Sequence, residues 1–235
     1  MDNEYQTRIE LAAAYRLVNK FGWDDVIYTH LSAKIPGTET FLINEYGLRF
    51  DEITASNLVK IDLHGNVLDR GNINYAGFVI HSAIHESRPN IQCIIHTHTN
   101  EGIAVSSDSR GLMPISQQSL LVLQSLAYHD YQGIAADEEE KVDLKKNLAD
   151  KHSLILRNHG LLTVGESIPS AFRRMYNLQR ACEIQTLCDL NYVKLIPQDV
   201  INNFQNRSNL FSESVPRPNM IWEALIRKLD NSYKL

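Results

Sequence analysis

The chain has 235 residues, a formal net charge of −5 at pH 7 and a sequence pI of about 6.0. Its lysines and arginines form no run long enough to bind a polyanion, so we expect neither a nucleic acid nor a membrane surface as a partner. A chain of this length fits one large domain or two small ones. Because no Pro- or Gly-rich linker, repeat or low-complexity tract divides it, we predict a single domain over residues 1–235, with a C-terminal helical extension from about residue 201.

The cysteines and the N-terminus indicate the compartment. Cys93, Cys182 and Cys188 are an odd number and lie in an apolar strand and a predicted helix, so a disulfide framework is not expected. Residues 1–5 are acidic and lack the basic-then-apolar order of a signal peptide, and no apolar run approaches the length of a membrane span. We therefore predict a cytoplasmic protein in a reducing setting.

In the first half of the chain, helical and strand-like patterns alternate. Apolar residues at three- and four-residue spacing predict an amphipathic helix over 6–20, and strict alternation predicts a strand over 26–35. The turn at 36–38 then joins this strand in a hairpin to a second one. The remaining expected elements are a strand at 41–43, a short helix at 51–56, a strand at 58–62, and a helix that begins near Ala76 and stops at Arg88-Pro89.

The second half continues the alternation, which is typical of an α/β protein. An apolar run covers 120–126, and a cluster of hydrogen-bonding and titratable side chains follows at 128–133. The other expected elements are a solvated helix at 137–150, a β-like run at 154–160, a strand at 161–164, a long helix from Ser167 to about Cys188, a polar loop at 201–215, and a last helix containing Ile221, Leu225 and Leu229.

The stretch from Cys93 to Thr99 carries the strongest chemical signal. It is an apolar run that ends in His96-Thr97-His98, and alternate side chains of a strand share one face, so the two imidazoles lie side by side. A second β-like run, Leu154 to Gly160, ends in His159. If the two runs are neighbours in one sheet, three histidines meet and leave one coordination position open, as in catalytic zinc sites. Neutral imidazole also binds iron, copper and nickel, so the identity of the metal stays open.

Other histidines and one carboxylate are weaker candidates. His30 lies on a strand face, where a packed role competes with a catalytic one. His81 and His85 are four residues apart on a helix, but they lack the glutamate of the zincin motif. Glu101 follows His98 by three residues, near enough to serve as a base, although a carboxylate there is also typical of a helix N-terminus.

Three groups of residues resemble the class II aldolase and adducin head-domain family. They are His96-Thr97-His98, the stretch from Arg157 to Leu162, and the Tyr128–Tyr131 cluster between them. The segments Ala76–His85 and Phe50–Ser56 look like the adducin branch of this family. The resemblance runs from the first helix to about residue 190. It implies a three-layer α/β/α fold around a mixed or mainly antiparallel sheet, and commonly a tetrameric ring.

The resemblance also implies one Zn²⁺ per chain, held by His96, His98 and His159, with Fe²⁺ or another divalent metal as the alternative. The chain departs from the sugar-phosphate aldolases of the family at the position of their acid/base glutamate, where it has Gly77. Tyr75 and Ala76 replace two serines that hold the substrate phosphate, and His30 replaces an asparagine. We therefore expect a rebuilt phosphate pocket.

Three functions remain in consideration. The first is a metal-dependent lyase that acts on a small carbonyl or hydroxy-acid substrate through enolate stabilisation, with Glu101, His30 or metal-bound hydroxide in place of the missing glutamate. The second is a non-catalytic assembly or binding protein of the adducin type. The third is an iron-dependent oxidative decarboxylase at the same three histidines. The sequence identifies neither the substrate nor the residues that bind it.

Overall fold

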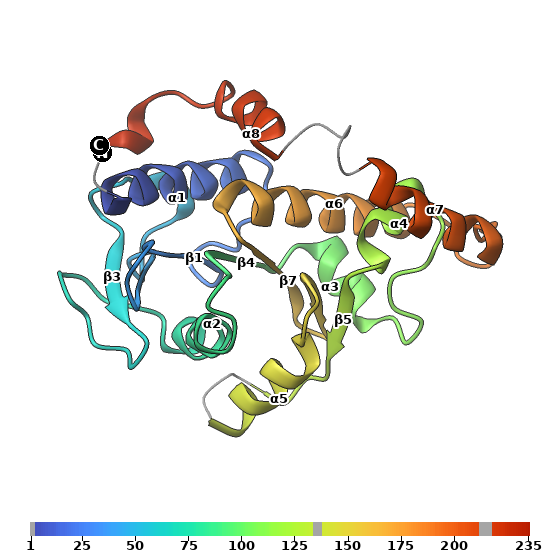
Figure 1. Ribbon diagram of the computed structural model, residues 1–235, viewed down its shortest axis with the longest axis horizontal. Helices are drawn as coiled ribbons and strands as arrows, with labels where there is room; N and C mark the ends of the chain where they lie inside the picture. The colour runs from blue at the N-terminus through green and yellow to red at the C-terminus, as the bar shows by residue number, and fades with distance from the viewer. Residues whose placement is uncertain (1–2, 134–137, 212–217) are drawn as a thin grey trace.

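The computed structural model describes residues 3–133, 138–211 and 218–235, in which seven strands form one sheet with helices on both faces (Figure 1). The strand order is β3-β2-β1-β4-β7-β6-β5. Only β5 and β6 pair in parallel, and the other five pairs of neighbours are antiparallel. The expected α/β/α fold with a mainly antiparallel sheet is therefore confirmed. The strands are β1 (His30–Lys34), β2 (Thr40–Ile43), β3 (Val59–Asp62), β4 (Cys93–Thr97), β5 (Leu126–His129), β6 (Ser153–Leu156) and β7 (Gly160–Gly165).

The helices form two layers of unequal size. The larger layer contains α1 and α6, with α3, α4 and α8 beside them, whereas α2 and α5 cover the opposite face (Figure 1). None of the described helices is both long enough and apolar enough to cross a lipid bilayer. The helices are α1 (Asn3–Lys20), α2 (Tyr75–Ser87), α3 (Asn100–Ser107), α4 (Gln117–Leu123), α5 (Glu138–Leu148), α6 (Ile168–Thr186), α7 (Gln198–Phe211) and α8 (Pro218–Ile226).

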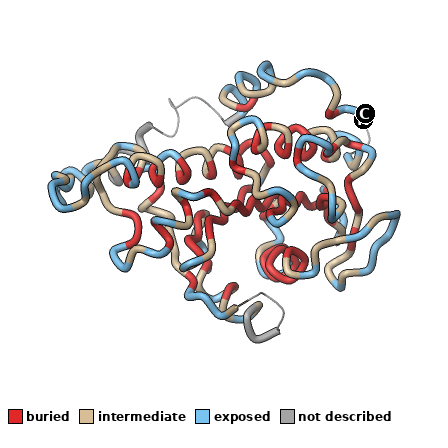
Figure 2. Tube along the Cα trace, turned by 180° about the vertical axis from the view of Figure 1, so that it is seen from behind, coloured by how far each residue is buried: buried red, intermediate tan, exposed pale blue. Residues whose placement is uncertain are grey.

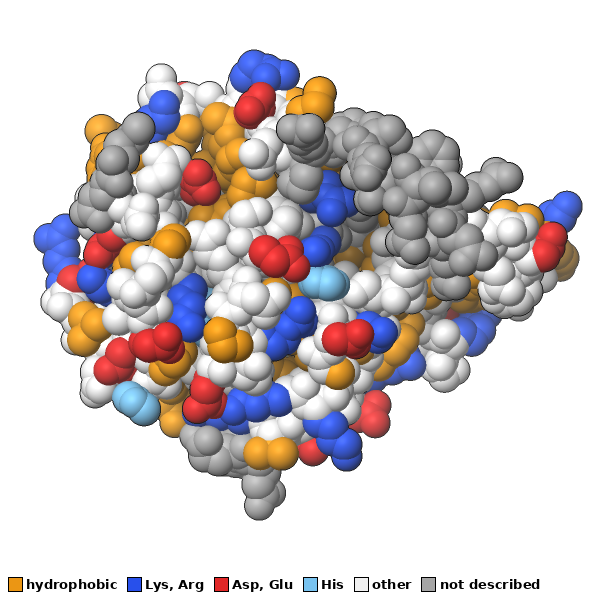
Figure 3. Space-filling view, viewed as in Figure 1, with side chains coloured by type: hydrophobic (Ala, Val, Ile, Leu, Met, Phe, Trp, Pro, Cys, Tyr) orange, Lys and Arg blue, Asp and Glu red, His pale blue; other side chains and the backbone are white. Residues whose placement is uncertain are grey.

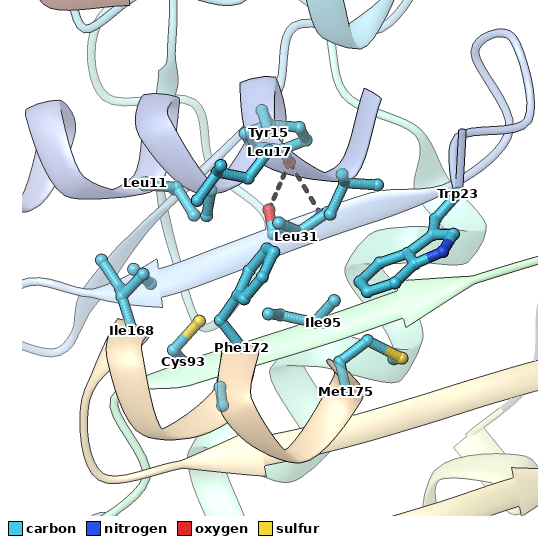
Figure 4. Packing of buried hydrophobic residues seen from close by; sticks show 14 of the residues in the cluster. Leu11, Tyr15, Leu17, Trp23, Leu31, Cys93, Ile95, Ile168, Phe172 and Met175 are labelled. Carbon is cyan, nitrogen blue, oxygen red and sulfur yellow. Dashed lines mark hydrogen bonds between the residues drawn. The ribbon is translucent and has the colours of Figure 1, made fainter. Parts of the chain in front are cut away.

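Strand β4 lies in the middle of the sheet and is buried along its whole length (Figure 2). Its side chains alternate, so that Cys93 and Ile95 enter the core beneath α1 and α6 (Figure 4), whereas Ile94 enters the core beneath α2 and α5. His96 follows Ile94 by two residues and shares its face. The first histidine of the motif is therefore buried beneath α2.

The hydroxyl of Tyr15 links the first helix to the first hairpin. It accepts hydrogen bonds from the backbone N–H groups of Leu31, at 2.8 Å, and Asn44, at 3.0 Å, and it also lies within hydrogen-bond distance of the Leu31 carbonyl (Figure 4). The tyrosine ring packs edge-on against Phe50 at 4.6 Å between centroids. The side chain is completely buried, so a single oxygen satisfies two buried donors that would otherwise lack partners.

The strand predicted over 26–35 is wrong in its first part, because β1 begins only at His30. Val26 has a φ of +51°, a left-handed conformation that a β-branched residue rarely adopts. The N–H of Tyr28 donates to the carbonyl of Asp25 at 2.8 Å and closes a turn. The alternation over 26–29 therefore belongs to a loop that precedes the strand.

Two further predictions need correction. Residues 201–211, predicted as the first part of a polar loop, belong to α7, which starts at Gln198; the rest of that loop, up to 215, lies outside the described residues. The short helix predicted at 51–56 is a 3₁₀ turn over Phe50–Glu52.

The helix predicted at 137–150 is confirmed as α5, although Asp137 lies outside the described residues and Leu144 and Leu148 are buried rather than solvated.

We predict that Tyr15→Phe lowers the free energy of unfolding by roughly 2–4 kcal/mol, because it leaves two buried N–H groups without their acceptor. The measurement is urea denaturation. Tyr5→Phe is the matched control, since Tyr5 is exposed, and it should change stability by less than about 0.5 kcal/mol. Equal stability of the two variants would contradict the role given to the Tyr15 hydroxyl.

Candidate metal centre

Three histidines predicted from the sequence meet at one end of β4. His96 lies in β4, His98 follows that strand, and His159 occupies the turn between β6 and β7. The run Leu154–Leu156, which forms β6, is not a neighbour of β4, because β7 lies between them and pairs with both. The turn nevertheless returns His159 to the same edge. Asn158, with a φ of +56°, makes this sharp reversal.

The Nε2 atoms of the three rings converge. That of His98 lies 2.8 Å from Nε2 of His96 and 2.9 Å from Nε2 of His159. Candidate donor atoms of all three residues lie within 4.8 Å of one another. Among the described residues, this is the group of histidine, cysteine and acidic side chains that could hold a metal ion. This arrangement presents three imidazole nitrogens to a single point.

The Nδ1 atoms fix which nitrogen carries the lone pair. Nδ1 of His96 donates to the backbone carbonyl of Leu161 at 2.9 Å, and Nδ1 of His98 donates to a carboxylate oxygen of Asp25 at 3.1 Å. Neither acceptor has a proton to give, so in the neutral rings Nε2 is unprotonated. Two lone pairs then face each other at 2.8 Å. A divalent cation relieves this repulsion by accepting them, so the residues present fit a metal ion.

The environment keeps these rings neutral, which is the form that binds metal. Burial, followed by the neighbouring imidazoles, holds the pKa of His96 well below its usual value. Burial lowers the pKa of His159 to about 4, with His98 and His129 contributing. The pKa of His98 is also lowered by burial, although Asp25 partly opposes the shift.

The cluster has a closed floor and a partly open rim. His96 is completely buried, whereas His98 and His159 are partly exposed. A cavity of about 10 Å³ adjoins His159 and is lined by Tyr131, Arg157 and others, enough for about one water molecule. A larger cavity of about 460 Å³ lies between Lys34–Glu39 and Pro89–Gln92, at the opposite ends of β1 and β4. Its position excludes it as the entrance to the cluster.

His30 lies against the cluster and fills the space beside Gly77. Its ring centroid is 5.0 Å from that of His96, and the two residues are paired across β1 and β4. A Cβ atom at residue 77 would lie 2.6 Å from Cδ2 of His30. The imidazole of His30 therefore occupies the space that a side chain at residue 77 would need.

A buried chain of hydrogen bonds holds His30 in this place. Its Nδ1 lies 2.9 Å from Nε2 of His81, Nδ1 of His81 lies 2.5 Å from the hydroxyl of Ser32, and this hydroxyl is 2.8 Å from Nε2 of His85. Burial lowers the pKa values of His30 and His85 to about 3. His81 and His85 therefore bridge α2 to β1 through His30 and Ser32.

Glu101, the other predicted catalytic residue, is directed away from the three histidines. Its carboxylate accepts a hydrogen bond from Nε2 of Gln179 in α6 at 3.2 Å. The carbonyl oxygen of the same Gln179 amide accepts from the hydroxyl of Thr99 at 2.6 Å. Glu101 thus belongs to the contact between α3 and α6, and the structure brings His30, but not Glu101, against the cluster.

Nothing in the sequence pointed to Asp25, because the residue stands just before the strand predicted over 26–35 and belongs to no recognised motif. The contact between His30 and Gly77 was also missed, since the two residues were matched separately to different family positions. The contact of Asp25 with His98 could have been found only by recognising that residues 24–29 form a loop ending beside β4.

Comparison with known proteins gives consistent matches. The sequence profile of the Class II Aldolase and Adducin N-terminal domain matches residues 9–186. A "Putative aldolase class 2 protein" of Pseudomonas aeruginosa is 51% identical over 97% of this chain and 90% of its own length. Alpha-adducin of Rattus norvegicus is 45% identical over 95% of this chain, which spans only 33% of adducin. The crystal structure of an aldolase II superfamily protein from Pseudomonas syringae is 45% identical, with a TM-score of 0.94 over 100% of this chain and 97% of its own.

We predict that Gly77→Ala lowers the free energy of unfolding by roughly 1–3 kcal/mol, because the new methyl group collides with the His30 ring. In a His30→Ala background the same change should cost much less. Thermal or urea denaturation of the two single variants and the double variant gives the coupling directly. Additive effects would show that the two residues do not compete for one space.

We predict that the metal-free protein loses stability as the pH falls from 6.5 to 5. The pKa values of His30 and His85 lie at about 3 in the folded protein, against 6.5 ordinarily. Between pH 6.5 and 5 these two histidines therefore take up protons in the unfolded chain but not in the folded one. Each such histidine costs up to roughly 1 kcal/mol per pH unit in this window. Urea denaturation at several pH values measures the slope, which should be shallower in His85→Gln. A stability independent of pH in this range would contradict the prediction.

Proposed function

Because the chain belongs to the class II aldolase and adducin N-terminal domain family, as its sequence motifs indicated, we propose that it is a metal-dependent lyase. Its reaction is the cleavage of a carbon–carbon bond in a small carbonyl or hydroxy-acid substrate. The observation that carries the proposal is the convergence of three Nε2 atoms, with Nδ1 of His96 and of His98 each bound to an acceptor on the far side of its ring.

We assign the metal to His96, His98 and His159, with one ion per chain. When bound, a divalent ion acts as a Lewis acid that polarises the substrate carbonyl and balances the negative charge that develops on it. Three protein ligands leave a position for the substrate, whereas a structural zinc is normally closed by a fourth. Zn²⁺ is the expected ion, and Fe²⁺ or another divalent metal is compatible with the same nitrogen donors.

The protein residues around the ion bind the metal and orient the substrate. His96 forms the buried floor, and the partly exposed rings of His98 and His159 form the rim at which the substrate enters. We assign a polar contact with the substrate to His30, because it is the candidate that lies against the cluster. Its Nδ1 is paired with His81, which leaves Nε2 for this contact.

The start of α2 favours a substrate without a phosphate group. Tyr75 is 62% exposed and lines a pocket with His64 and Phe78 that contains none of the three histidines. Ala76 and Gly77 carry no hydrogen-bonding side chain, and the ring of His30 fills the room beside Gly77. We therefore place the substrate among unphosphorylated carbonyl or hydroxy acids.

Several related expectations remain proposals. They are a homo-oligomer, a tetramer by resemblance to the family, a single domain over residues 1–235, and a cytoplasmic location. A tetramer would place the rim of each site near a neighbouring subunit. Size-exclusion chromatography with light scattering measures the oligomeric state directly.

An assembly role is the second candidate. It is favoured by the 45% identity to alpha-adducin over 95% of this chain and by the glycine at residue 77. In this case the histidine cluster would stabilise the fold and would not turn over a substrate.

The test of the lyase proposal joins metal analysis to a substrate screen. We expect about one zinc per chain in the purified protein, and loss of this metal in a His96→Ala/His98→Ala variant. Aldols and β-keto acids are then screened for cleavage or decarboxylation, and His159→Ala should lower any turnover by at least about 100-fold while the fold is retained.

The other outcomes are equally informative. Turnover that survives His159→Ala would refute the mechanism. Iron in place of zinc, with oxygen-dependent turnover, would favour the oxidative decarboxylase. The absence of bound metal after incubation with zinc would favour the assembly role, and reproducible capture of one partner protein would then support it.

A further inference from the structure

We propose that Asp25 is a positioning residue of the metal centre, whose carboxylate fixes the tautomer and orientation of His98. The inference rests on the metal ion of the proposed function, and it concerns the protein's affinity for this ion rather than the reaction. The carboxylate lies 3.1 Å from Nδ1 of His98 and approaches it from the loop between α1 and β1.

The three histidines differ in how they are held. His96 is oriented by the backbone carbonyl of Leu161, which no substitution removes. For Nδ1 of His159, the described part of the chain shows no comparable acceptor. His98 is oriented by the side chain of Asp25, so among the described contacts this is the orienting group that mutation can delete. Its Nε2 also lies between those of His96 and His159, so a rotation of this ring would disturb the whole cluster.

The carboxylate has no competing partner among the described residues. The adjacent Asp24 instead accepts a hydrogen bond from the amide of Asn19 at 3.0 Å. The side chain of Asp25 is 43% exposed, so a carboxylate there could remain fully hydrated at no cost. Asp25 nevertheless contacts His98, and partner carboxylates of this kind raise the basicity of a metal-binding imidazole.

The backbone is strained at Val26, next to the residue whose carboxylate contacts His98. Val26 has a φ of +51° and is 59% exposed, so burial of its side chain does not compensate for the strain. Trp23 and Thr29, on the two sides of the turn, are buried. A strained residue that persists without packing of its own is typical of functional loops. Here the turn places Asp25 directly over His98.

The experiment measures metal affinity without any substrate. The full-length protein is stripped with a chelator, and the dissociation constants for Zn²⁺ and Co²⁺ are measured by competition with a chromophoric chelator. The variants are Asp25→Ala and Asp25→Asn. Asp24→Asn is the matched control because it removes the same charge one residue away.

We expect Asp25→Ala to weaken metal binding by about 10- to 100-fold. Asp25→Asn should fall between Asp25→Ala and the unchanged protein, because its amide oxygen still accepts the hydrogen bond but carries no charge. The Asp24→Asn control should stay within about threefold, and near-ultraviolet circular dichroism of the metal-free variants should match that of the unchanged protein. The visible spectrum of bound Co²⁺ should also change in Asp25→Ala.

Two results would overturn the inference. Unchanged affinity in Asp25→Ala would show that the hydrogen bond does not position His98. An equal loss in Asp24→Asn would show that only the local negative charge matters. Failure of the unchanged protein to bind either metal would overturn the metal centre itself, whereas a protein that binds metal with the expected ranking of variants but cleaves no substrate would refute only the lyase proposal.

Discussion

The pairing of β4 with β7 is the interaction on which the rest of the structure depends. Cys93–Thr97 lies antiparallel to Leu161–Gly165 at the centre of the sheet, with a separate apolar core on each face. This register places the end of β4 beside the start of β7, so one histidine in β4 and one just after it meet a third from a turn more than 60 residues later. A slip by one residue would send every side chain of β4 to the opposite face and would separate the three rings.

The sequence predicted most of this framework because its signals were local. The period of the apolar residues located α1, α2 and α6, and the alternating His-x-His pattern correctly placed His96 and His98 side by side. Charged residues of both signs are interspersed over the face shown in Figure 3, as the absence of a basic run implied. The expected meeting with His159 was also right, although the sequence did not show that β7, rather than β6, pairs with β4.

The errors arose where the conformation depends on distant contacts. An alternating pattern ran through Val26, yet its left-handed backbone is imposed by a turn held between buried Trp23 and Thr29. Because that turn was read as a strand, the contact of Asp25 with His98 could not be foreseen. Glu101 was a catalytic candidate by sequence distance, whereas in the helix that starts at Asn100 its side chain accepts a hydrogen bond from Gln179. Spacing along a chain does not reveal direction once a strand gives way to a helix.

The close fit of His30 against Gly77 also restricts how the sequence can change. A larger side chain at residue 77 is compatible with the fold only after the imidazole at residue 30 has become smaller or moved, whereas the reverse order of substitutions passes through a sterically blocked intermediate. The effect of one substitution therefore depends on the residue already present at the other site. This epistasis favours substitution at residue 30 before substitution at residue 77. It also means that grafting a glutamate onto α2, as a route to a different catalyst, requires a simultaneous change in the first strand.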